Sequence, residues 1–166
     1  MNPRIRTARL VDATEISGLV QESFRAYVAS DWETEARVSF LSETTAEKLG
    51  APIAEATFAA VCEEHGHIVG VILLPRPNLV QLCFVIPTHV RRGIGTALWE
   101  AARTHLETHF PEVKTVELNA SPYAVAPYTA MGFFPISKPY RRRGTVATRM
   151  ACWLPARTLE RTPDAV

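Results

Sequence analysis

The sequence predicts an α+β domain built on a mixed, mostly antiparallel sheet, and three observations lead to that fold class. Apolar segments in the middle of the chain are separated by tight-turn signals, as in consecutive antiparallel strands. A strand, a helix and another strand follow them, an order that differs from the repeated pattern of a doubly wound sheet. At 166 residues, 47% of them hydrophobic, the chain can bury one core. We therefore expect a single domain over residues 1–155 and a polar tail over 156–166.

The first third of the chain predicts a strand followed by helices. Residues 5–10 alternate loosely between apolar and polar side chains, as a short strand does. Asp12 can cap a helix, and apolar residues then recur at helical spacing as far as Tyr27. The acidic region 29–56 has a weaker pattern. It predicts one or two short helices, with a break at Gly50-Ala51-Pro52.

A β-hairpin and a buried strand are predicted next. The apolar segments 57–62 and 67–74 flank residues 63–66, where Gly66 can supply the positive φ that a tight turn requires. A second turn follows at residues 75–78. Residues 79–86 are apolar except for Gln81, which predicts a strand covered on both faces.

The second half of the chain alternates helices and strands. Apolar residues at helical spacing predict a helix from about residue 94 to 109. Ser121-Pro122 is typical of a helix start and Gly132 of a helix end. The remaining patterns predict a strand over 113–118 and a final strand pair, 133–136 and 145–154, joined by a basic loop.

Composition argues against several classes of protein. The formal net charge of +1 gives no field that would attract nucleic acid or a membrane surface. Cys62, Cys83 and Cys152 are odd in number and far apart, which disfavours a disulfide framework or a thiolate zinc site. The amino terminus lacks the apolar stretch of a signal peptide, and no apolar run approaches the roughly 20 residues of a membrane span. We expect a cytoplasmic protein without a metal.

The segment Val90-Arg91-Arg92-Gly93-Ile94-Gly95-Thr96 joins an apolar strand directly to a helix. Backbone N–H groups of such a turn and of the first helical turn converge on one point and favour an anion. Glycine at two positions lets phosphate oxygens approach the backbone, and two arginines add charge. A plainer explanation is that the glycines only let the chain turn into the helix. The spacing matches neither the dinucleotide fingerprint nor a P-loop, so the phosphate would belong to another ligand.

Two motifs give the chain a resemblance to a known family. Residues 90–98 resemble the (Q/R)-x-x-G-x-(G/A) motif of the GNAT superfamily of acyl-CoA-dependent N-acetyltransferases. The segment from Asn119 through Tyr128 to Gly132-Phe133 resembles the family's N…A…Y-x-x-x-G-F segment, and residues 5–16 resemble its opening strand and helix. Two positions depart from the pattern: Val90 replaces the usual Gln or Arg, and Pro127 replaces a common aromatic residue before the tyrosine.

The resemblance implies a fold and a cofactor. The fold would be a three-layer α/β/α arrangement whose sheet is splayed between its fourth and fifth strands. Acetyl-CoA would be the co-substrate, with its pantetheine arm along the strand containing Cys83, Phe84 and Val85. Asn119 would hydrogen-bond that arm. The pyrophosphate would be held by backbone N–H groups of the loop, namely those of Arg91, Arg92, Gly93, Ile94, Gly95 and Thr96.

The resemblance also implies an activity. The acetyl group would pass to a primary amine of a small molecule or a peptide by direct attack, with Tyr128 as general acid to the leaving thiolate. Among the acidic and histidine side chains near the first hairpin, we nominate Glu63 as the base that makes the amine neutral. The alternative is a non-catalytic acyl-CoA-binding or regulatory domain of the same fold. A homodimer is left open.

The acceptor is not chosen by the sequence. In this family the acceptor pocket is built from the first helical region and the last strand pair. Here the former contributes aromatic and acidic residues, which favour a cationic amine, and the latter an arginine run, which favours an acidic substrate. The run lacks interleaved aromatic residues, so we expect no nucleic-acid binding. The two sets are Tyr27, Asp31, Trp32, Glu33 and Glu35, and Tyr140, Arg141, Arg142 and Arg143.

Overall fold

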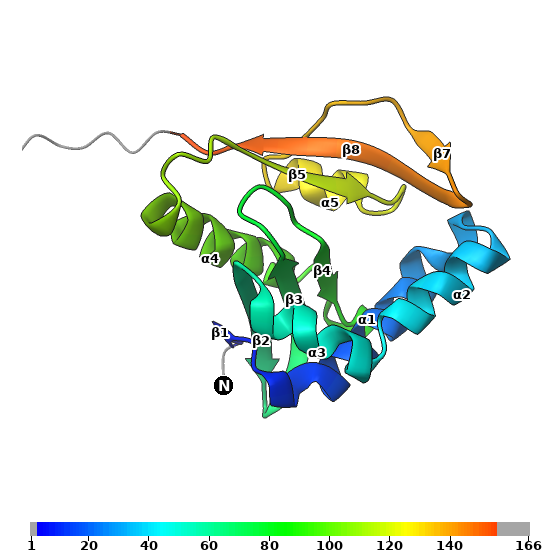
Figure 1. Cartoon of the computed structure of the whole chain (residues 1–166), viewed down its shortest axis with the longest axis horizontal. Coiled ribbons are helices and arrows are strands. Elements are labelled where there is room, and N and C mark those ends of the chain that lie inside the picture. Colours follow the sequence, from blue (N-terminus) through cyan, green and yellow to red (C-terminus); the bar gives the residue numbers. More distant parts are fainter. Residues whose placement is uncertain (1–2, 156–166) are drawn as a thin grey trace, which may run out of the picture.

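The computed structural model describes residues 3–155, and the predicted tail over 156–166 lies outside them (Figure 1). Short 3₁₀ turns at Leu10–Asp12, Ala29–Asp31 and Pro87–His89 connect some of the elements. The helices are α1 (Ala13–Tyr27), α2 (Thr34–Glu43), α3 (Ala46–Glu55), α4 (Ile94–His109) and α5 (Val125–Ala130). The strands are β1 (Arg4–Thr7), β2 (Phe58–Glu64), β3 (His67–Leu74), β4 (Leu82–Val85), β5 (Thr115–Ala120), β6 (Phe134–Pro135), β7 (Tyr140–Arg142) and β8 (Thr145–Trp153).

The strands form two sheets that separate between β4 and β5, as expected. The first sheet has the order β1-β2-β3-β4 and the second has the order β5-β8-β6, with β7 also paired to β8; all these pairs are antiparallel. Just before β4, the N–H of Val80 donates to the carbonyl of Glu117 at 3.0 Å, in a parallel bridge region. Beyond that bridge the two strands belong to different sheets, which leaves one edge of β4 open.

Helices cover both faces of the first sheet, because apolar residues of β3 alternate between them. Ile68, Val71 and Leu73 belong to the core under α1 and α3, whereas Val69 and Ile72 belong to the core under α4. Figure 1 shows these helices on opposite sides of the sheet. The helix α4 lies close to β3 at a glycine. A Cβ at Gly70 would lie 2.7 Å from Cγ2 of Ile94, so the glycine lets the start of α4 approach the sheet.

The predicted hairpin is confirmed, although its strands extend nearer to the turn than the apolar pattern indicated. Only His65 and Gly66 connect β2 and β3, and both have left-handed backbones, with φ of 52° and 81°. Two left-handed central residues are typical of a two-residue type I′ turn. Glu63 and Glu64 are therefore strand residues with opposite orientations rather than members of a solvated loop.

The predicted helix break at residues 50–52 is wrong. The helix α3 runs through Pro52, with Leu49 and Ile53 buried against the α1 core. The free energy gained by burying these side chains exceeds the free energy of the one hydrogen bond that a proline removes near the end of a short helix.

Two further boundaries also differ from prediction. Residues 121–124 form a turn, so α5 begins at Val125 rather than at Ser121. The expected basic loop contains the strand β7, which pairs with β8 through a turn at Arg143 and Gly144.

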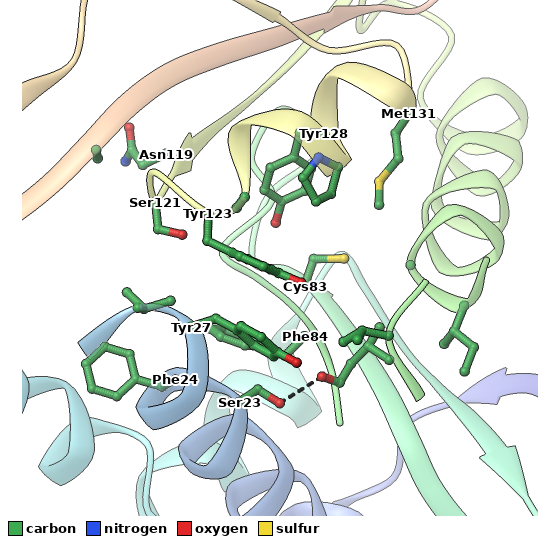
Figure 2. Close-up of a pocket in the computed structure, with 18 of the residues that line it drawn as sticks. Ser23, Phe24, Tyr27, Cys83, Phe84, Asn119, Ser121, Tyr123, Tyr128 and Met131 are labelled. Carbon is green, nitrogen blue, oxygen red and sulfur yellow. Dashed lines mark hydrogen bonds between the residues drawn. The ribbon is translucent and has the colours of Figure 1, made fainter. Parts of the chain in front are cut away.

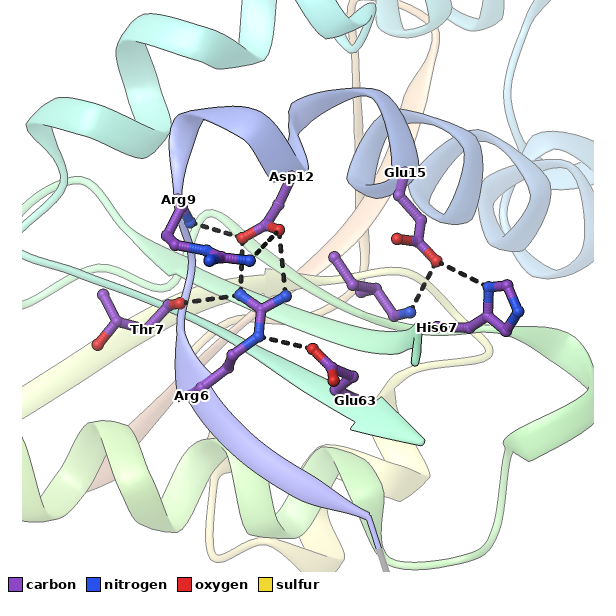
Figure 3. Close-up of polar contacts among 8 residues, drawn as sticks. Arg6, Thr7, Arg9, Asp12, Glu15, Glu63 and His67 are labelled. Atoms are coloured by element: carbon purple, nitrogen blue, oxygen red, sulfur yellow. Dashed lines mark hydrogen bonds and ion pairs between the residues drawn. The ribbon is translucent and has the colours of Figure 1, made fainter. Parts of the chain in front are cut away.

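Asp12 precedes α1 but does not cap it through its side chain. Its carboxylate accepts hydrogen bonds from the Arg6 guanidinium at 2.7 Å and from the Arg9 backbone N–H at 2.7 Å (Figure 3). The hydrogen bond from Arg6 is the largest influence on this carboxyl, and it helps to lower the pKa of Asp12 to about 2. The same guanidinium donates to Glu63 of β2 at 2.7 Å, so it ties the start of α1 to the first sheet.

Candidate active site

A cavity of about 550 Å³ lies in the opening between β4 and β5 (Figure 2). It is bounded by the start of α4, by α5, by α1 and α2, and by the β7–β8 hairpin. Arg92 and Glu63 do not line it. The predicted site residues that the structure brings together along its wall are Cys83, Phe84, Val85, Arg91, Gly93, Ile94, Gly95, Thr96, Asn119 and Tyr128.

The start of α4 presents backbone N–H groups to this cavity. The first helical hydrogen bond runs from the N–H of Ala97 to the carbonyl of Gly93 at 3.0 Å, and no side chain caps the helix. The N–H groups of Ile94, Gly95 and Thr96 precede that bond and have no helical partner, an arrangement that in general favours an anion. Gly93 has a φ of 78°, so it is required by the backbone conformation.

A different constraint applies at Gly95. A Cβ there would lie 2.9 Å from Cε of Met131, and Met131 also lines the cavity. The end of this flexible side chain would have to move to admit a Cβ at Gly95. The predicted role of Gly95, access of phosphate oxygens to the backbone, stays a prediction.

Arg92 braces the loop. Its guanidinium donates to the carboxylate of Glu64 at 2.9 Å, and His89 Nε2 is 2.7 Å from the same carboxylate. Burial acts to raise the pKa of Glu64, but the hydrogen bonds from His89 and Arg92 outweigh it and lower the pKa. Glu64 therefore stays ionised and ties both ends of the loop to β2. Of the two arginines in the loop, Arg91, whose φ is 63°, lines the cavity and Arg92 does not.

The open edge of β4 presents main-chain groups to the cavity. The N–H of Ile86 donates to the carbonyl of Val69 on β3 at 3.0 Å. Because peptide groups alternate in direction along a strand, the main-chain groups of Val85 and Cys83 point to the other edge. In agreement, the Val85 carbonyl accepts a hydrogen bond from the Ser23 hydroxyl of α1 at 2.8 Å (Figure 2). This edge can pair with an amide-containing ligand.

Tyr128 projects from α5 toward Cys83 of β4 (Figure 2). Pro127 lies in the first turn of α5, and the N–H of the next residue, Tyr128, donates to the Ala124 carbonyl at 3.0 Å, so the helix continues past the proline. The ring packs edge-on against Phe133 with centroids 5.6 Å apart. Burial, with Cys83 nearby, raises the pKa of Tyr128 well above 10. Its hydroxyl therefore carries a proton at neutral pH.

The structure places Glu63 away from this chemistry. Its carboxylate faces Arg6 on β1, on the far side of β2 from the open edge of β4 (Figure 3). The side chain is 33% exposed, is paired with a guanidinium and does not line the cavity, so it does not have the location that a base for the acceptor requires. Asn119 does line the cavity, where its Oδ1 accepts a hydrogen bond from the Tyr140 hydroxyl at 3.1 Å.

The other end of the cavity is aromatic. Phe24 stacks on Phe40 with ring centroids 4.2 Å apart, and Trp32 contacts Phe24 edge-on with ring centroids 5.2 Å apart. Tyr27 stacks on Tyr123 with ring centroids 4.3 Å apart. The aromatic members of the two sets noted in the sequence line the cavity, but their charged members do not, and Glu33 and Arg141 face each other at 4.0 Å. Other cavity residues have the spacing of ordinary buried or surface positions, so the sequence did not indicate them; they include Ser23, Phe40, Tyr123 and Met131.

Comparison with known proteins identifies the family. A sequence model described as the acetyltransferase (GNAT) domain matches residues 27–154. The chain belongs to the GNAT acetyltransferase family. The motif around residues 90–98 and the segment ending at Gly132-Phe133 both lie within the matched region. A search of curated protein sequences gives no match.

Solved structures share the GNAT fold. A GCN5-related N-acetyltransferase from Rhodopseudomonas palustris is 20% identical, with a TM-score of 0.80 over 93% of this chain and 97% of that one. The PaiA N-acetyltransferase from Thermoplasma acidophilum, solved in complex with coenzyme A, is 17% identical, with a TM-score of 0.73 over 92% and 99%. The ribosomal-protein-S18-alanine N-acetyltransferase from Escherichia coli is 19% identical, with a TM-score of 0.64 over 92% and 94%. At these identities the likeness concerns the fold.

Residues 3–155 contain no group of side chains arranged for a metal ion and no helix that could span a membrane. No cluster of three or more His, Cys, Asp or Glu side chains in this range has an arrangement that could hold a metal ion. Within the same range, every helix is too short or too polar to cross a bilayer.

Proposed function

We propose that this protein transfers an acetyl group from acetyl-CoA to a primary amine by direct attack of that amine. One observation carries the proposal: a single cavity connects the uncapped start of α4, the open edge of β4 and the Tyr128 hydroxyl. An anion site, a strand edge and an acid therefore lie along one path. That order matches a ligand with a pyrophosphate at one end and a thioester at the other.

The residues along this path fit acetyl-CoA. The N–H groups of Ile94, Gly95 and Thr96, with the Arg91 side chain, would hold the pyrophosphate. The main-chain groups of Cys83 and Val85 would pair with the pantetheine amides, and Asn119 would bind the same arm from β5. When bound, acetyl-CoA supplies a thioester whose acyl carbon is open to attack by an amine.

The acceptor amine must be neutral to react, and the cavity itself favours the neutral form. None of the described residues that line the cavity is acidic. Desolvation in an apolar pocket disfavours the charged form of an amine and lowers its pKa. We therefore assign no side chain as the base that deprotonates the amine, and this includes Glu63.

Tyr128 is the residue that we assign as the acid. Its phenol stays protonated because burial raises its pKa. Burial also raises the pKa of the neighbouring Cys83 thiol, from 9.0 to about 12. A thiolate leaving group in the same slot is destabilised for the same reason, and the neighbouring phenol is the protonated group that can donate to its sulfur. Positioned acids of this kind contribute about 10²–10⁴-fold to rate.

A panel of amines tests the proposal. Calorimetry would measure acetyl-CoA binding, and a thiol reagent would measure release of free coenzyme A with small-molecule and peptide amines. We expect binding, and release that depends on the amine. Binding without release across the whole panel would instead support a non-catalytic acyl-CoA-binding domain. Absence of binding would contradict both the transfer and the assignment of the anion site.

A further inference from the structure

The acceptor end of the cavity lacks acidic groups among the residues that the structure describes. Only Arg91 and His89 are basic along the wall, and both precede α4 at the other end. The acidic residues that the sequence offered nearby, such as Glu33, point to Arg141 and to solvent instead. An acceptor carrying several ammonium groups would have to bury them without partners, which is strongly unfavourable.

The same end provides a large aromatic surface. The helices α1 and α2 contribute Phe24, Tyr27 and Phe40, and Trp32 lies between the two helices. The ring of Tyr123 reaches across from the segment after β5 and stacks on Tyr27 (Figure 2). Aromatic rings prefer offset stacks and edge-on contacts with other rings, and such contacts add to the gain from burial alone.

We propose, on the basis of the acetyl transfer proposed above, that the acceptor is a small monoamine with an aromatic body. Its ring would lie among Tyr27, Phe40 and Tyr123, and its amino group would point toward Tyr128. Polyamines and aminoglycosides are excluded as good substrates because none of the described residues that line the cavity offers a carboxylate to balance their charges.

Binding to the coenzyme A-saturated protein tests this acceptor class independently of turnover. Calorimetry would compare 2-phenylethylamine and tyramine with spermidine and kanamycin at matched concentrations. We expect the aromatic monoamines to bind at least about tenfold more tightly, which corresponds to about 1.4 kcal/mol. Equal or tighter binding of either polycation would overturn the inference, as would absence of binding by both monoamines at millimolar concentration.

Turnover with the same four amines separates this inference from the proposed activity. Release of coenzyme A with the monoamines alone supports both. Binding of the monoamines without release contradicts the acetyl transfer and leaves the acceptor class supported. Release with the polycations at equal or greater kcat/KM supports the transfer and overturns the acceptor class.

Two variants locate the binding surface. Tyr123→Glu places a carboxylate on the aromatic wall at a side chain that is 44% exposed, so folding should tolerate it. We expect about a tenfold loss in kcat/KM for 2-phenylethylamine and a gain for spermidine. Val38→Glu is the matched control, because Val38 is 61% exposed on α2 and does not line the cavity. An equal loss in both variants would contradict the proposed location.

Discussion

At the α4 end of the cavity the groups that could bind a ligand are mostly main-chain groups from one continuous stretch, β4 and the loop that follows it. At the α1–α2 end they are side chains from segments that are far apart in sequence, including Phe24, Phe40, Tyr123 and Tyr140. Main-chain groups are the same in every residue, so their direction depends on a local turn and a strand edge. The shape and chemistry of a wall made of side chains depend on which residue each of these distant segments contributes. The first end is therefore suited to an invariant cofactor and the second to a particular acceptor.

The largest expected effect is at the main-chain end. Gly93→Glu forces a side chain onto a backbone with φ of 78° and brings a carboxylate to the anion site. We expect acetyl-CoA binding, measured by calorimetry, to weaken at least about 100-fold, because charge-assisted hydrogen bonds are worth about 1.5–3 kcal/mol each. Gly66→Glu is the control. Gly66 has a φ of 81° and open space around it but lies in the β2–β3 turn. Equal weakening in the control would show a folding defect rather than a lost site.

Tyr128 stands at the junction of the two ends. We expect Tyr128→Phe to lower kcat at least about tenfold with little change in acetyl-CoA affinity, because the change removes only the acid. Tyr123→Phe also loses a phenol from the cavity wall and should keep most of its activity. Unaltered turnover in Tyr128→Phe would remove this residue from the mechanism.

The pH profile of the wild-type protein provides a second test of Tyr128. A pKa raised well above 10 means that the phenol stays protonated below pH 10. The rate should then show no loss from deprotonation of this acid between pH 7 and 10. A descending limb in that range that is absent from Tyr128→Phe would contradict the raised pKa.

A smaller effect is expected where a side chain supports the main-chain end. Glu64→Gln removes the charge that holds Arg92 and His89. We expect the KM for acetyl-CoA to rise by roughly threefold to tenfold with kcat little changed, because the loop would be less well positioned. Glu100→Gln breaks an exposed pair with Arg103 on α4 and serves as the control. Steady-state kinetics in which the two variants behave alike would argue against the bracing role.

The smallest effect is expected at Glu63. Glu63→Gln should leave kcat within about twofold of the original at every pH tested, because this carboxylate pairs with Arg6 outside the cavity. Stability should be followed by thermal unfolding, since the pair links β2 to β1. A tenfold fall in kcat without a change in stability would restore Glu63 as the base.

Much of the fold and one end of the site could be predicted because the signals are local. The hairpin at Gly66, the helix after Gly93 and the loop between β4 and α4 each depend on a few adjacent residues. The predicted helix break at Pro52 and the predicted side-chain cap by Asp12 are wrong for the same reason. In each case a contact with a residue distant in sequence decided the local conformation. Burial of Ile53 stabilises the helix on both sides of the proline, and the Asp12 carboxylate accepts a hydrogen bond from Arg6 instead of capping the helix.

The same distinction applies to the charged residues. Sequence spacing cannot show that Arg92 faces Glu64 or that Glu63 faces Arg6, because adjacent residues of a strand point to opposite faces of the sheet. Sequence spacing also does not show that Glu33 and Arg141 lie near each other outside the cavity. Among the described residues, the aromatic wall therefore has no acidic group.

By itself, the sequence determined the family, the fold class and the turn that presents main-chain N–H groups at the start of α4. These follow from backbone conformation and periodicity, which neighbouring residues largely set. Only the tertiary structure decided which side chains face the cavity, which ionic groups neutralise one another, and that Tyr128 meets Cys83. Those outcomes depend on how α1, α2 and the β7–β8 hairpin pack around the open edge of β4. Local sequence in any one of these segments does not determine that packing.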